Sequence, residues 1–345
     1  MKLLVFTQKV DLDDTVLAFF HRWILELAKH CERLTVVCLY KGRHELPPAV
    51  RVFSLGKETG RSRVKYVRNF FRSASLLKDD YDSVFVHMNQ EYVLLGGFYW
   101  KSLGKKIFMW RNHYAGSLLT DAAALFCDKV FCTSKYSYTA KYAKTVLMPV
   151  GVDTEVFKPI EGVRRMEHSI LSLGRISPSK KIEQLIEALA ILKKQGSRFV
   201  ASIYGDALPP DAGYYRMLKE KARELELDDR LSFKPGVPNR ATPAIYSAHD
   251  IFVNLSPSGM FDKTIFEAMA SGTIIVSSNR DLADKIDAEY LFEENDVGGL
   301  AARISGLLAI RREERDARGE RLRKYAAENH GLGLLAKRLA LEMSA

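Results

Sequence analysis

Short runs of apolar residues alternate with helix-like segments along the whole chain, and this rhythm restricts the possible folds more than any other feature. The runs are continuous rather than alternating in polarity, as is typical of parallel strands covered on both faces. In the first half they cover Lys2–Thr7, Leu34–Leu39, Ser83–His87, Lys106–Trp110, Lys129–Thr133 and Val146–Val150. In the second half they cover Ser169–Leu173, Phe199–Tyr204, Leu231–Phe233, Asp250–Leu255 and Thr273–Ser277. The rhythm predicts two successive α/β units, each a doubly wound, Rossmann-like sheet, facing each other across a central cleft.

Two units also suit the length of the chain, because 345 residues exceed what one hydrophobic core usually organises. The rhythm breaks between residues 157 and 168, where Pro159 and a run of charges intervene. We therefore expect a first domain over residues 1–158, a second over residues 159–320 and a C-terminal helical segment over residues 321–345. Ligands of open parallel sheets gather beyond the carboxyl ends of the strands, so candidate site residues are sought there.

Composition excludes several classes of protein. With 47% hydrophobic and 27% charged residues, the chain is typical of a globular protein and not of a disordered one. The longest apolar run, Tyr92–Trp100, is about half of the ~18 residues that a membrane-spanning helix needs. The N-terminal run Leu3–Phe6 is too short for a signal peptide, so we expect a cytoplasmic protein. The cysteines have no metal-ligand spacing, so we expect buried thiols, no disulfide and no metal site. They are Cys31, Cys38, Cys127 and Cys132.

Positive charge is concentrated in the first half of the chain. Residues 1–160 contain 24 Lys and Arg against 15 Asp and Glu, whereas the remainder contains 28 against 27. This asymmetry favours an anionic partner for the first half, which leaves nucleic acid, phospholipid and phosphorylated small molecules open.

One segment of the first half combines charge with helical periodicity. Arg61, Lys65, Arg68 and Arg72 recur at spacings that place them on one helical face beside an apolar side. Such a basic amphipathic helix is able to lie on an anionic membrane surface. The alternative is a solvated face over an internal apolar stripe.

Two cations follow the first strand of the second half, where that strand leads into a helix. The sequence after Leu173 reads GRISPSKK, and Ser177 followed by Pro178 predicts the helix start there. Arg175 and Lys180 thus lie where backbone donors and the helix dipole already favour an anion. A diphosphate fits this environment, although two solvated surface charges would have the same spacing.

A second helix start follows the strand Asp250–Leu255. A loop containing Gly259 leads into a short helix that ends at Gly272. Glu267 is the anomaly of this helix, because a carboxylate among small apolar residues needs hydrogen-bond donors. A ribose diol would supply them, whereas a surface glutamate would need none.

Taken together, the motifs resemble those of retaining glycosyltransferases of family 4, which have the GT-B fold. The strings are GRISPSKK, MPVGVDTEVFKP, SIYGDA, LSFKPGVP, YSAHDIFVNLSPS and FEAMASGTIIVSS, in the family's order over roughly residues 130–310. The resemblance implies sugar transfer from a nucleoside diphosphate sugar, UDP- or GDP-linked, to a hydroxyl of a glycan, lipid-linked or small-molecule acceptor, with retention and without a metal or other cofactor.

The resemblance also implies residue roles in the second half. Arg175 and Lys180 would neutralise the donor diphosphate during catalysis, Glu267 would hold the ribose, and Gly236 with Val237 would lie near the base. It further implies that the last of two charged helices between Arg311 and Met343 crosses back onto the first domain.

The chain departs from the family pattern at one donor contact. The family often carries two glutamates eight positions apart, and the first of these positions is Gly259 here. We expect Asp262, or the backbone of residues 260–264, to take over the contact with the donor sugar, so Lys263 and Thr264 are also candidate donor contacts.

Acceptor candidates lie in the first half. His113 follows the strand Lys106–Trp110 and matches in position the family histidine beside the reacting sugar. His87 also follows a strand, and Asn89 and Arg111 are further candidate acceptor contacts. A structural role remains the alternative for each histidine.

Three other interpretations compete with an active transferase. A non-catalytic nucleotide-sugar-binding subunit is the alternative that Gly259 suggests, and a nucleotide-sugar epimerase on the same architecture is another. The third is nucleic-acid binding, which has no supporting motif, so no nucleic-acid partner is expected.

The spacing Asp11-x-Asp13 resembles a metal-binding motif of the GT-A architecture of glycosyltransferases, but the other motifs match GT-B.

Overall fold

A computed structural model describes residues 1–14 and 16–344, and the chain divides into two compact units. Unit 1 contains residues 1–151 and the C-terminal segment from Leu332, and unit 2 contains residues 152–331. The first boundary thus precedes the predicted one at residue 158, because Val152 already pairs with Gly331 as a parallel bridge. The second boundary, after Gly331, lies beyond the predicted one at residue 320, because residue 320 is inside a helix that continues to His330.

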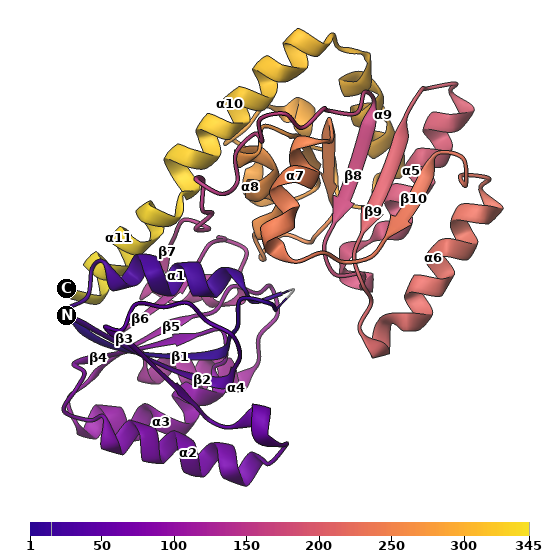
Figure 1. Cartoon of the computed structure of the whole chain (residues 1–345). Coiled ribbons are helices and arrows are strands. Elements are labelled where there is room, and N and C mark those ends of the chain that lie inside the picture. Colours follow the sequence, from indigo (N-terminus) through magenta and orange to yellow (C-terminus); the bar gives the residue numbers. More distant parts are fainter. Residues whose placement is uncertain (15, 345) are drawn as a thin grey trace. The chain divides into compact units, whose positions relative to one another are not determined.

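Unit 1 is built on a seven-stranded sheet with the order β3-β2-β1-β4-β5-β6-β7, in which every pair of neighbours is parallel (Figure 1). The strand order reverses between β1 and β4, which makes this the topological switch point. The strands are β1 (Lys2–Val10), β2 (Arg33–Lys41), β3 (Val50–Ser54), β4 (Ser83–His87), β5 (Lys106–Trp110), β6 (Lys129–Cys132) and β7 (Thr145–Leu147).

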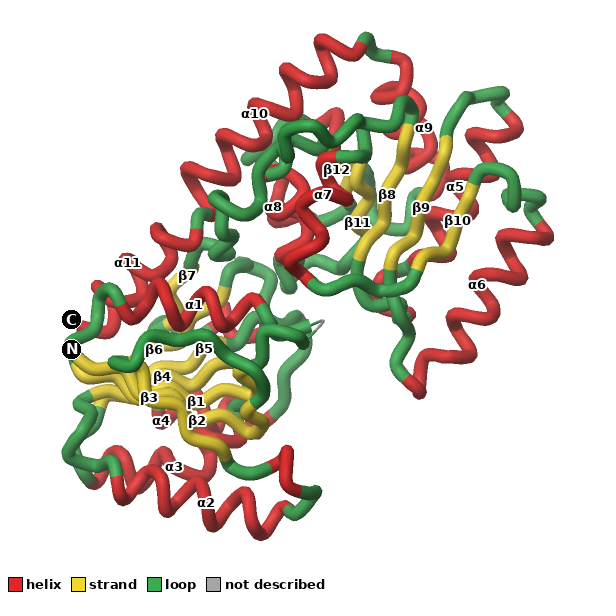
Figure 2. The backbone as a smooth tube through the Cα atoms, viewed as in Figure 1, coloured by secondary structure: helices red, strands yellow, loops and turns green. Residues whose placement is uncertain are grey.

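Helices cover both faces of this sheet (Figure 2). One core joins the sheet to α1 and α11, with Phe20, Trp23 and Leu335 among its buried members. The other joins the opposite side chains of the strands to α2, α3 and α4, through Phe70 and Trp100 among others. The helices are α1 (Phe19–Ala28), α2 (Arg63–Leu76), α3 (Glu91–Ser102), α4 (Leu118–Phe126) and α11 (Leu332–Ser344), with 3-10 turns at Lys57–Thr59 and Tyr138–Lys141.

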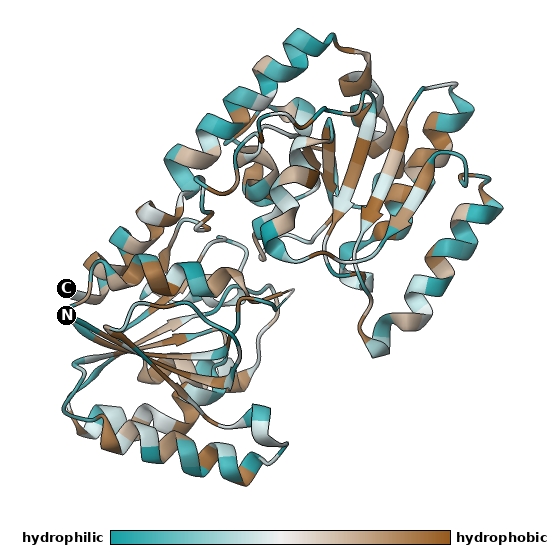
Figure 3. Ribbon diagram, viewed as in Figure 1, coloured by the Kyte–Doolittle hydropathy of each residue, from teal (hydrophilic) through white to brown (hydrophobic). Residues whose placement is uncertain are grey.

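Unit 2 contains a five-stranded parallel sheet with the order β10-β9-β8-β11-β12. Its switch point lies between β8 and β11, where Ile170 is in register with Ile251. The strands are β8 (Ser169–Leu173), β9 (Val200–Tyr204), β10 (Leu231–Lys234), β11 (Ile251–Asn254) and β12 (Ile274–Ser277). Their interiors are hydrophobic, as Figure 3 shows, because both faces are covered.

The helices of unit 2 form two packed groups. Helix α5 contacts α6 and α9, and α8 contacts α7 and α10. They are α5 (Ile182–Lys194), α6 (Ala212–Glu224), α7 (Thr242–Ser247), α8 (Lys263–Ala270), α9 (Val297–Ala309) and α10 (Arg312–His330). A buried ion pair fixes α10 to the start of β11, since Arg315 Nη1 donates to Asp250 Oδ2 at 2.5 Å.

The prediction of two doubly wound parallel sheets is confirmed. Two local predictions were incomplete or wrong. The strand β3 was missed, because this edge strand mixes Arg51 and Ser54 with its apolar residues. The helix start predicted at Ser177 and Pro178 is a single 3-10 turn, and α5 begins only at Ile182, after Lys181 adopts a left-handed conformation with φ 47°.

Within residues 1–14 and 16–344, no helix combines the length and the apolar character needed to cross a membrane.

Candidate functional site

The loops that follow the strands of unit 2 are joined to one another at the carboxyl edge of the sheet. The N–H of Gly174 donates to Tyr204 O at 3.0 Å, and the N–H of Gly205 donates to Lys234 O at 3.1 Å. A Cβ atom on Gly205 would lie 1.9 Å from the Gly174 carbonyl oxygen, so only glycine permits this approach. The edge is therefore a rigid base for the side chains around it.

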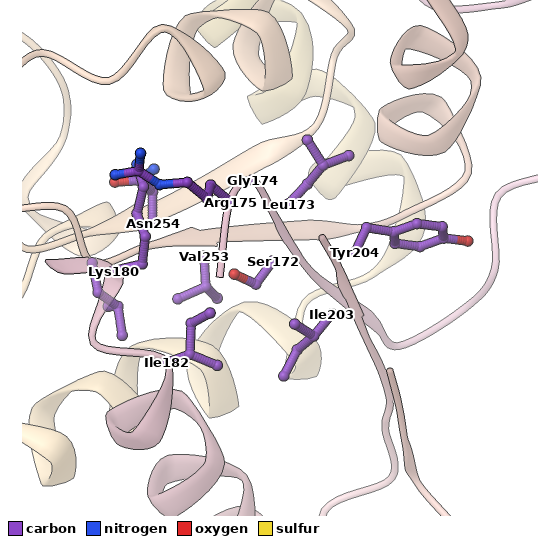
Figure 4. Close-up of a pocket in the computed structure, with 11 residues that line it drawn as sticks. Ser172, Leu173, Gly174, Arg175, Lys180, Ile182, Ile203, Tyr204, Val253 and Asn254 are labelled. Atoms are coloured by element: carbon purple, nitrogen blue, oxygen red, sulfur yellow. The ribbon is translucent and has the colours of Figure 1, made fainter. Parts of the chain in front are cut away.

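A pocket opens at this edge between β8, β9 and β11 (Figure 4). Arg175 and Lys180, the two cations predicted to hold a diphosphate, both line it. Arg175 is exposed, and its side chain extends toward Asn254 in Figure 4. The remaining lining residues are Ser172, Leu173, Gly174, Ile182, Ile203, Tyr204, Val253, Asn254 and Leu255.

Lys180 is fixed by a polar network at the start of α8. Its ammonium donates to Ser256 Oγ at 3.0 Å and forms an ion pair with Asp262. The same Asp262 oxygen accepts hydrogen bonds from Asn254 Nδ2 at 3.0 Å and from Ser256 Oγ at 2.9 Å. Lys180 thus has one defined position, as a preorganised cation requires.

Asp262 supports this network in two ways. Its other carboxylate oxygen accepts the N–H of Thr264 at 3.2 Å, which caps α8, and Asn254 Nδ2 also donates to Thr264 Oγ1 at 3.1 Å. Burial opposes ionisation of Asp262, but Lys180 and the hydrogen bonds from Asn254 and Ser256 outweigh it and hold the Asp262 pKa below its usual range. Asp262 is therefore a carboxylate that balances part of the Lys180 charge. Lys263 begins α8 next to it and is half-buried.

Glu267 lies on α8 and is 3% exposed. Its carboxylate accepts only long hydrogen bonds within the described part of the chain, from Asn239 Nδ2 and from Tyr246 Oη, each at 3.4 Å. Burial raises the pKa of Glu267 to about 7, although Lys263 partly offsets the effect. A carboxylate with such weak partners gains from any ligand that donates hydrogen bonds to it.

The loop between β11 and α8 takes its shape from Gly259. This residue has φ 90°, a conformation that a glutamate would adopt only with strain. Its N–H donates to Asp281 Oδ2 at 3.3 Å, and the N–H of Arg280 donates to Ser258 Oγ at 2.9 Å. These two hydrogen bonds join the loops after β11 and β12 at Gly259, the position at which the family pattern has its first glutamate.

Gly236 and Val237 follow β10 and are half-buried. A Cβ atom on Gly236 would lie 2.5 Å from Asp206 Oδ2, so this glycine allows the loops after β9 and β10 to meet. The N–H of Ile176 donates to Asp206 O at 3.0 Å, which links the loop that carries Arg175 to the same place.

Sequence reasoning missed several polar residues of this edge. Asn254 ends β11 and donates to Asp262, whereas Ser256, two residues later, binds both Lys180 and Asp262, so their positions at a strand end were the signal. Asp206 occupies the equivalent position after β9. The partners of Glu267, Asn239 and Tyr246, carried no such signal, because only the folded chain brings them to α8.

In unit 1, His113 lies in the loop between β5 and α4. Its Nδ1 atom accepts the N–H of Ala115 at 2.9 Å, and its ring stacks on Tyr114 with centroids 4.4 Å apart. Arg111 is half-buried, and Thr139 Oγ1 donates to its carbonyl oxygen at 2.9 Å.

Asn112 anchors this loop and was not predicted. Its Oδ1 atom accepts from Thr133 N at 3.2 Å, Thr133 Oγ1 at 2.8 Å and Ser137 Oγ at 3.2 Å. The N–H of Tyr138 also donates to His113 O at 2.9 Å. The neighbours of Asn112 in sequence, Arg111 and His113, therefore have a fixed backbone.

His87 is buried in unit 1 and belongs to an aromatic cluster. Its ring stacks on Phe20 at a centroid distance of 3.9 Å, and Trp23 lies 5.6 Å away. Its Nδ1 atom lies 3.2 Å from Thr7 Oγ1. Asn89 follows two residues later and is half-buried. The structure thus places His87 in the core and His113 in a loop, so the two histidine candidates do not form one cluster.

The predicted basic amphipathic helix is α2 with the residues that precede it. Arg61, Arg68 and Arg72 are exposed, whereas Lys65 is half-buried and donates to Thr59 Oγ1. Arg63, which the sequence analysis did not include in the basic face, is exposed as well.

Comparison with known proteins identifies the relatives of this chain. The family model described as glycosyl transferases group 1 matches residues 153–327, which is just over half of the chain. The alpha-monoglucosyldiacylglycerol synthase of Streptococcus pneumoniae is 28% identical over 228 residues, which are 59% of this chain and 50% of that protein. The mannosylfructose-phosphate synthase of Agrobacterium fabrum is 29% identical over 166 residues, 43% of this chain and 37% of that protein. The chain thus matches half or less of the length of these relatives.

Solved structures extend the likeness to the whole fold. HepE of Anabaena in complex with UDP superposes with a TM-score of 0.78 at 19% identity and covers 100% of both chains. Sucrose-phosphate synthase of Thermosynechococcus elongatus gives 0.81 at 18% identity, over 99% of this chain and 98% of that chain. The two Rossmann-like units are therefore those of the GT-B fold.

Proposed function

We propose that this chain, which belongs to the glycosyl transferases group 1 family, transfers a sugar from a nucleoside diphosphate sugar to a hydroxyl group of an acceptor. The observation that carries the proposal is the pocket lined by Arg175 and Lys180, in which Lys180 is fixed by Ser256 and Asp262. Enzymes that cleave a sugar–diphosphate bond need fixed positive charge where the leaving group becomes more negative.

In the proposed reaction the acceptor oxygen bonds to the anomeric carbon while the bond from that carbon to the diphosphate breaks. The proton of the acceptor hydroxyl passes to the leaving diphosphate, so no protein nucleophile is required. Attack from the face that the diphosphate leaves gives retention, which is the outcome typical of family 4. Arg175, Lys180 and the N–H groups of the loop after β8 stabilise the departing charge, and Asp262 keeps Lys180 in place.

The donor is held by the other residues of unit 2. Glu267 accepts both ribose hydroxyls, which replaces its long contacts with Asn239 and Tyr246. Gly236 and Val237 lie beside the base. The loop around Gly259, which hydrogen bonds join to the loop after β12, contacts the donor sugar together with Asp262, Lys263 and Thr264. Two similar structures contain UDP or UDP-glucose, so UDP-glucose is the first donor to test.

The acceptor binds through unit 1, where His113, Arg111 and Asn89 lie beyond the carboxyl ends of β4 and β5. One relative is named a monoglucosyldiacylglycerol synthase, so a glycerolipid is the first acceptor class to test. The cations of α2 then hold the protein on an anionic membrane as a peripheral, cytoplasmic enzyme.

The proposal is tested by incubating the purified chain with UDP-glucose, UDP-galactose or GDP-mannose and a panel of lipid and sugar acceptors. Transfer with the α-configuration of the product, unchanged by a chelator, is the expected result, and Arg175→Ala lowers the rate about 10²-fold. Donor binding without transfer or hydrolysis under any condition contradicts the proposal and favours a non-catalytic subunit. Conversion of the donor without an acceptor identifies an epimerase instead.

A further inference from the structure

Large apolar side chains are exposed on one face of unit 1, over helices α3 and α4. Phe98 of α3 is 79% exposed, and Leu118 and Leu125 of α4 are 84% and 81% exposed. Leu118 and Leu125 are seven positions apart on α4, so they share one helical side, and Asp121, the charged residue between them, is paired with Lys141, Tyr138 and Tyr142. Leu95 and Leu119 are exposed as well.

These side chains belong to a single layer. The ring of Phe70 on α2 lies 5.6 Å from that of Trp100 on α3, and a Cβ atom on Gly97 of α3 would touch the ring of Phe126 on α4. Helices α2, α3 and α4 therefore pack side by side over the same face of the sheet, as the core beneath them shows. Figure 1 shows α2 and α3 running alongside each other in the lower part of unit 1.

The α2 edge of this layer is strongly basic. Arg61, Arg63, Arg68 and Arg72 are exposed, and none of them forms an ion pair with any carboxylate in the described part of the chain. Val64 of the same helix is 80% exposed. Figure 3 shows hydrophilic and hydrophobic residues alternating along α2. Basic and apolar side chains thus lie next to each other on one exposed face.

The apolar part of the layer continues into the loop of the acceptor candidates. Leu118 begins α4 directly after Ser117, and the N–H of Ser117 donates to Thr120 Oγ1 at 3.1 Å in the capping box of this helix. The loop before it contains His113 and Tyr114, and Tyr114 is 44% exposed. The surface is therefore not remote from the site to which an acceptor is proposed to bind.

We infer that the outer face of α2, α3 and α4 docks on a lipid bilayer with anionic headgroups, so that Phe98, Leu118 and Leu125 enter the apolar region while the α2 arginines contact the headgroups. This deepens the proposed function, on which it rests, because it identifies the acceptor as a lipid reached from the membrane surface. Charge complementarity selects this partner: the α2 cations favour an anionic surface, whereas a second copy of the same face would bring like charges together.

The inference is tested by co-sedimentation with phosphatidylcholine vesicles that contain about a third of phosphatidylglycerol. The chain binds these vesicles at low salt and binds pure phosphatidylcholine weakly. The triple variant Arg61→Gln, Arg68→Gln, Arg72→Gln weakens partitioning about 100-fold at low salt, since each cation near the surface contributes about fivefold. A variant that replaces Phe98, Leu118 and Leu125 by serine weakens it at both low and high salt.

Matched variants control for charge and for exposed apolar area elsewhere. Lys194→Gln with Arg321→Gln and Lys324→Gln removes three exposed cations of unit 2, and Leu341→Ser removes an exposed leucine of α11. Both leave vesicle binding unchanged. Absence of wild-type binding to anionic vesicles overturns the inference, and so does a dimer in solution that the serine variant dissociates, because it identifies a second copy as the occupant.

Donor binding separates this inference from the proposed function. In the serine variant the thermal shift caused by UDP stays that of the wild type, because the donor residues lie in unit 2. Vesicle binding without any UDP-dependent shift contradicts the proposed function alone. Normal UDP binding and transfer to a short-chain, water-dispersed acceptor without vesicle binding contradicts the membrane inference alone.

Discussion

The carboxyl edges of the two sheets differ in how their polar residues are held. In unit 2, Lys180, Asp262 and their partners form one continuous network, and the loops after β8, β9 and β10 are joined through backbone hydrogen bonds. In unit 1, the loop of His113 is anchored by Asn112 and by the backbone N–H of Tyr138, and the His113 ring contacts its loop neighbours Ala115 and Tyr114. His87, the last residue of the neighbouring strand β4, is enclosed by aromatic rings.

This difference suits two different ligands. The nucleoside diphosphate part has the same charges in every donor, so the fixed cations and carboxylates of unit 2 would suit any donor proposed to bind there. Acceptors vary in shape, and loops tolerate sequence change better than the strands and helices they connect. We therefore expect substitutions in unit 2 to affect every donor, and substitutions in the unit 1 loop to affect the acceptor alone.

The largest effect is expected from Lys180→Gln. Loss of the fixed charge beside the proposed diphosphate position is expected to lower kcat/KM for the donor about 10²- to 10³-fold, because the stabilisation acts on charge that develops as the leaving group departs. The measurement is the initial rate of sugar transfer or donor hydrolysis against donor concentration.

Lys181→Gln is the matched control for this variant. Lys181 is the adjacent cation, but it binds Glu294 and Asn295 at the protein surface, away from the pocket lining. Its replacement leaves kcat/KM within about twofold. Equal losses in the two variants would show that general surface charge, and not the network around Asp262, attracts the donor.

His87→Ala separates a structural histidine from an acceptor contact. Because its ring is buried against Phe20, its removal leaves a cavity and lowers the free energy of unfolding by about 3 kcal/mol. Activity per folded molecule stays near that of the wild type. Urea unfolding and acceptor kinetics measure the two effects, and His30→Ala, at an exposed position of the same unit, changes neither. A raised acceptor KM with unchanged stability would move His87 into the acceptor site.

The fold was largely predictable from the sequence, because continuous apolar runs at regular spacing leave few arrangements other than parallel sheets. The edge strand β3 escaped notice because its polarity is mixed. Arg175, Lys180 and Asp262 could be selected as candidates from the sequence, since they follow strands or precede a helix, and such positions are local in sequence; the structure places Arg175 and Lys180 at one pocket and pairs Lys180 with Asp262. The contacts of Glu267 with Asn239 and Tyr246 depend on how α8 packs, which no local pattern contains. For the same reason the burial of His87 could not be predicted from its place after a strand.

Glu267→Gln is expected to give opposite effects on stability and on donor binding. The folded-state pKa of about 7 lies above the ordinary value of 4.5, so the folded protein loses stability as the pH rises from 4.5 to 7 and the carboxylate becomes charged. The neutral glutamine avoids this loss and stabilises the protein by about 2 kcal/mol at pH 8, but has little effect at pH 4.

Donor binding shows the reverse dependence. The carboxylate accepts ribose hydroxyls better than the neutral acid, so the wild-type Kd for UDP increases as the pH falls below 7, whereas that of Glu267→Gln is weak and nearly independent of pH. Thermal melts and titration calorimetry between pH 5 and 8 measure both trends. A wild-type Kd that is constant over this range would contradict a role for Glu267 in ribose binding.

The smallest effect is expected at Asn112, which acts through its neighbours. Asn112→Ala removes the acceptor of three hydrogen bonds and frees the backbone of Arg111 and His113, so kcat/KM for the acceptor falls about tenfold. Asn112→Asp restores the activity, because a carboxylate oxygen accepts the same three hydrogen bonds. The Kd for UDP is expected to be unchanged in both variants, since every residue proposed to bind the donor lies in unit 2. Failure of the aspartate to restore the rate, or a parallel loss of UDP binding, would mean that the loop of unit 1 is not held in the way the structure indicates, and the contrast between the two edges would then disappear.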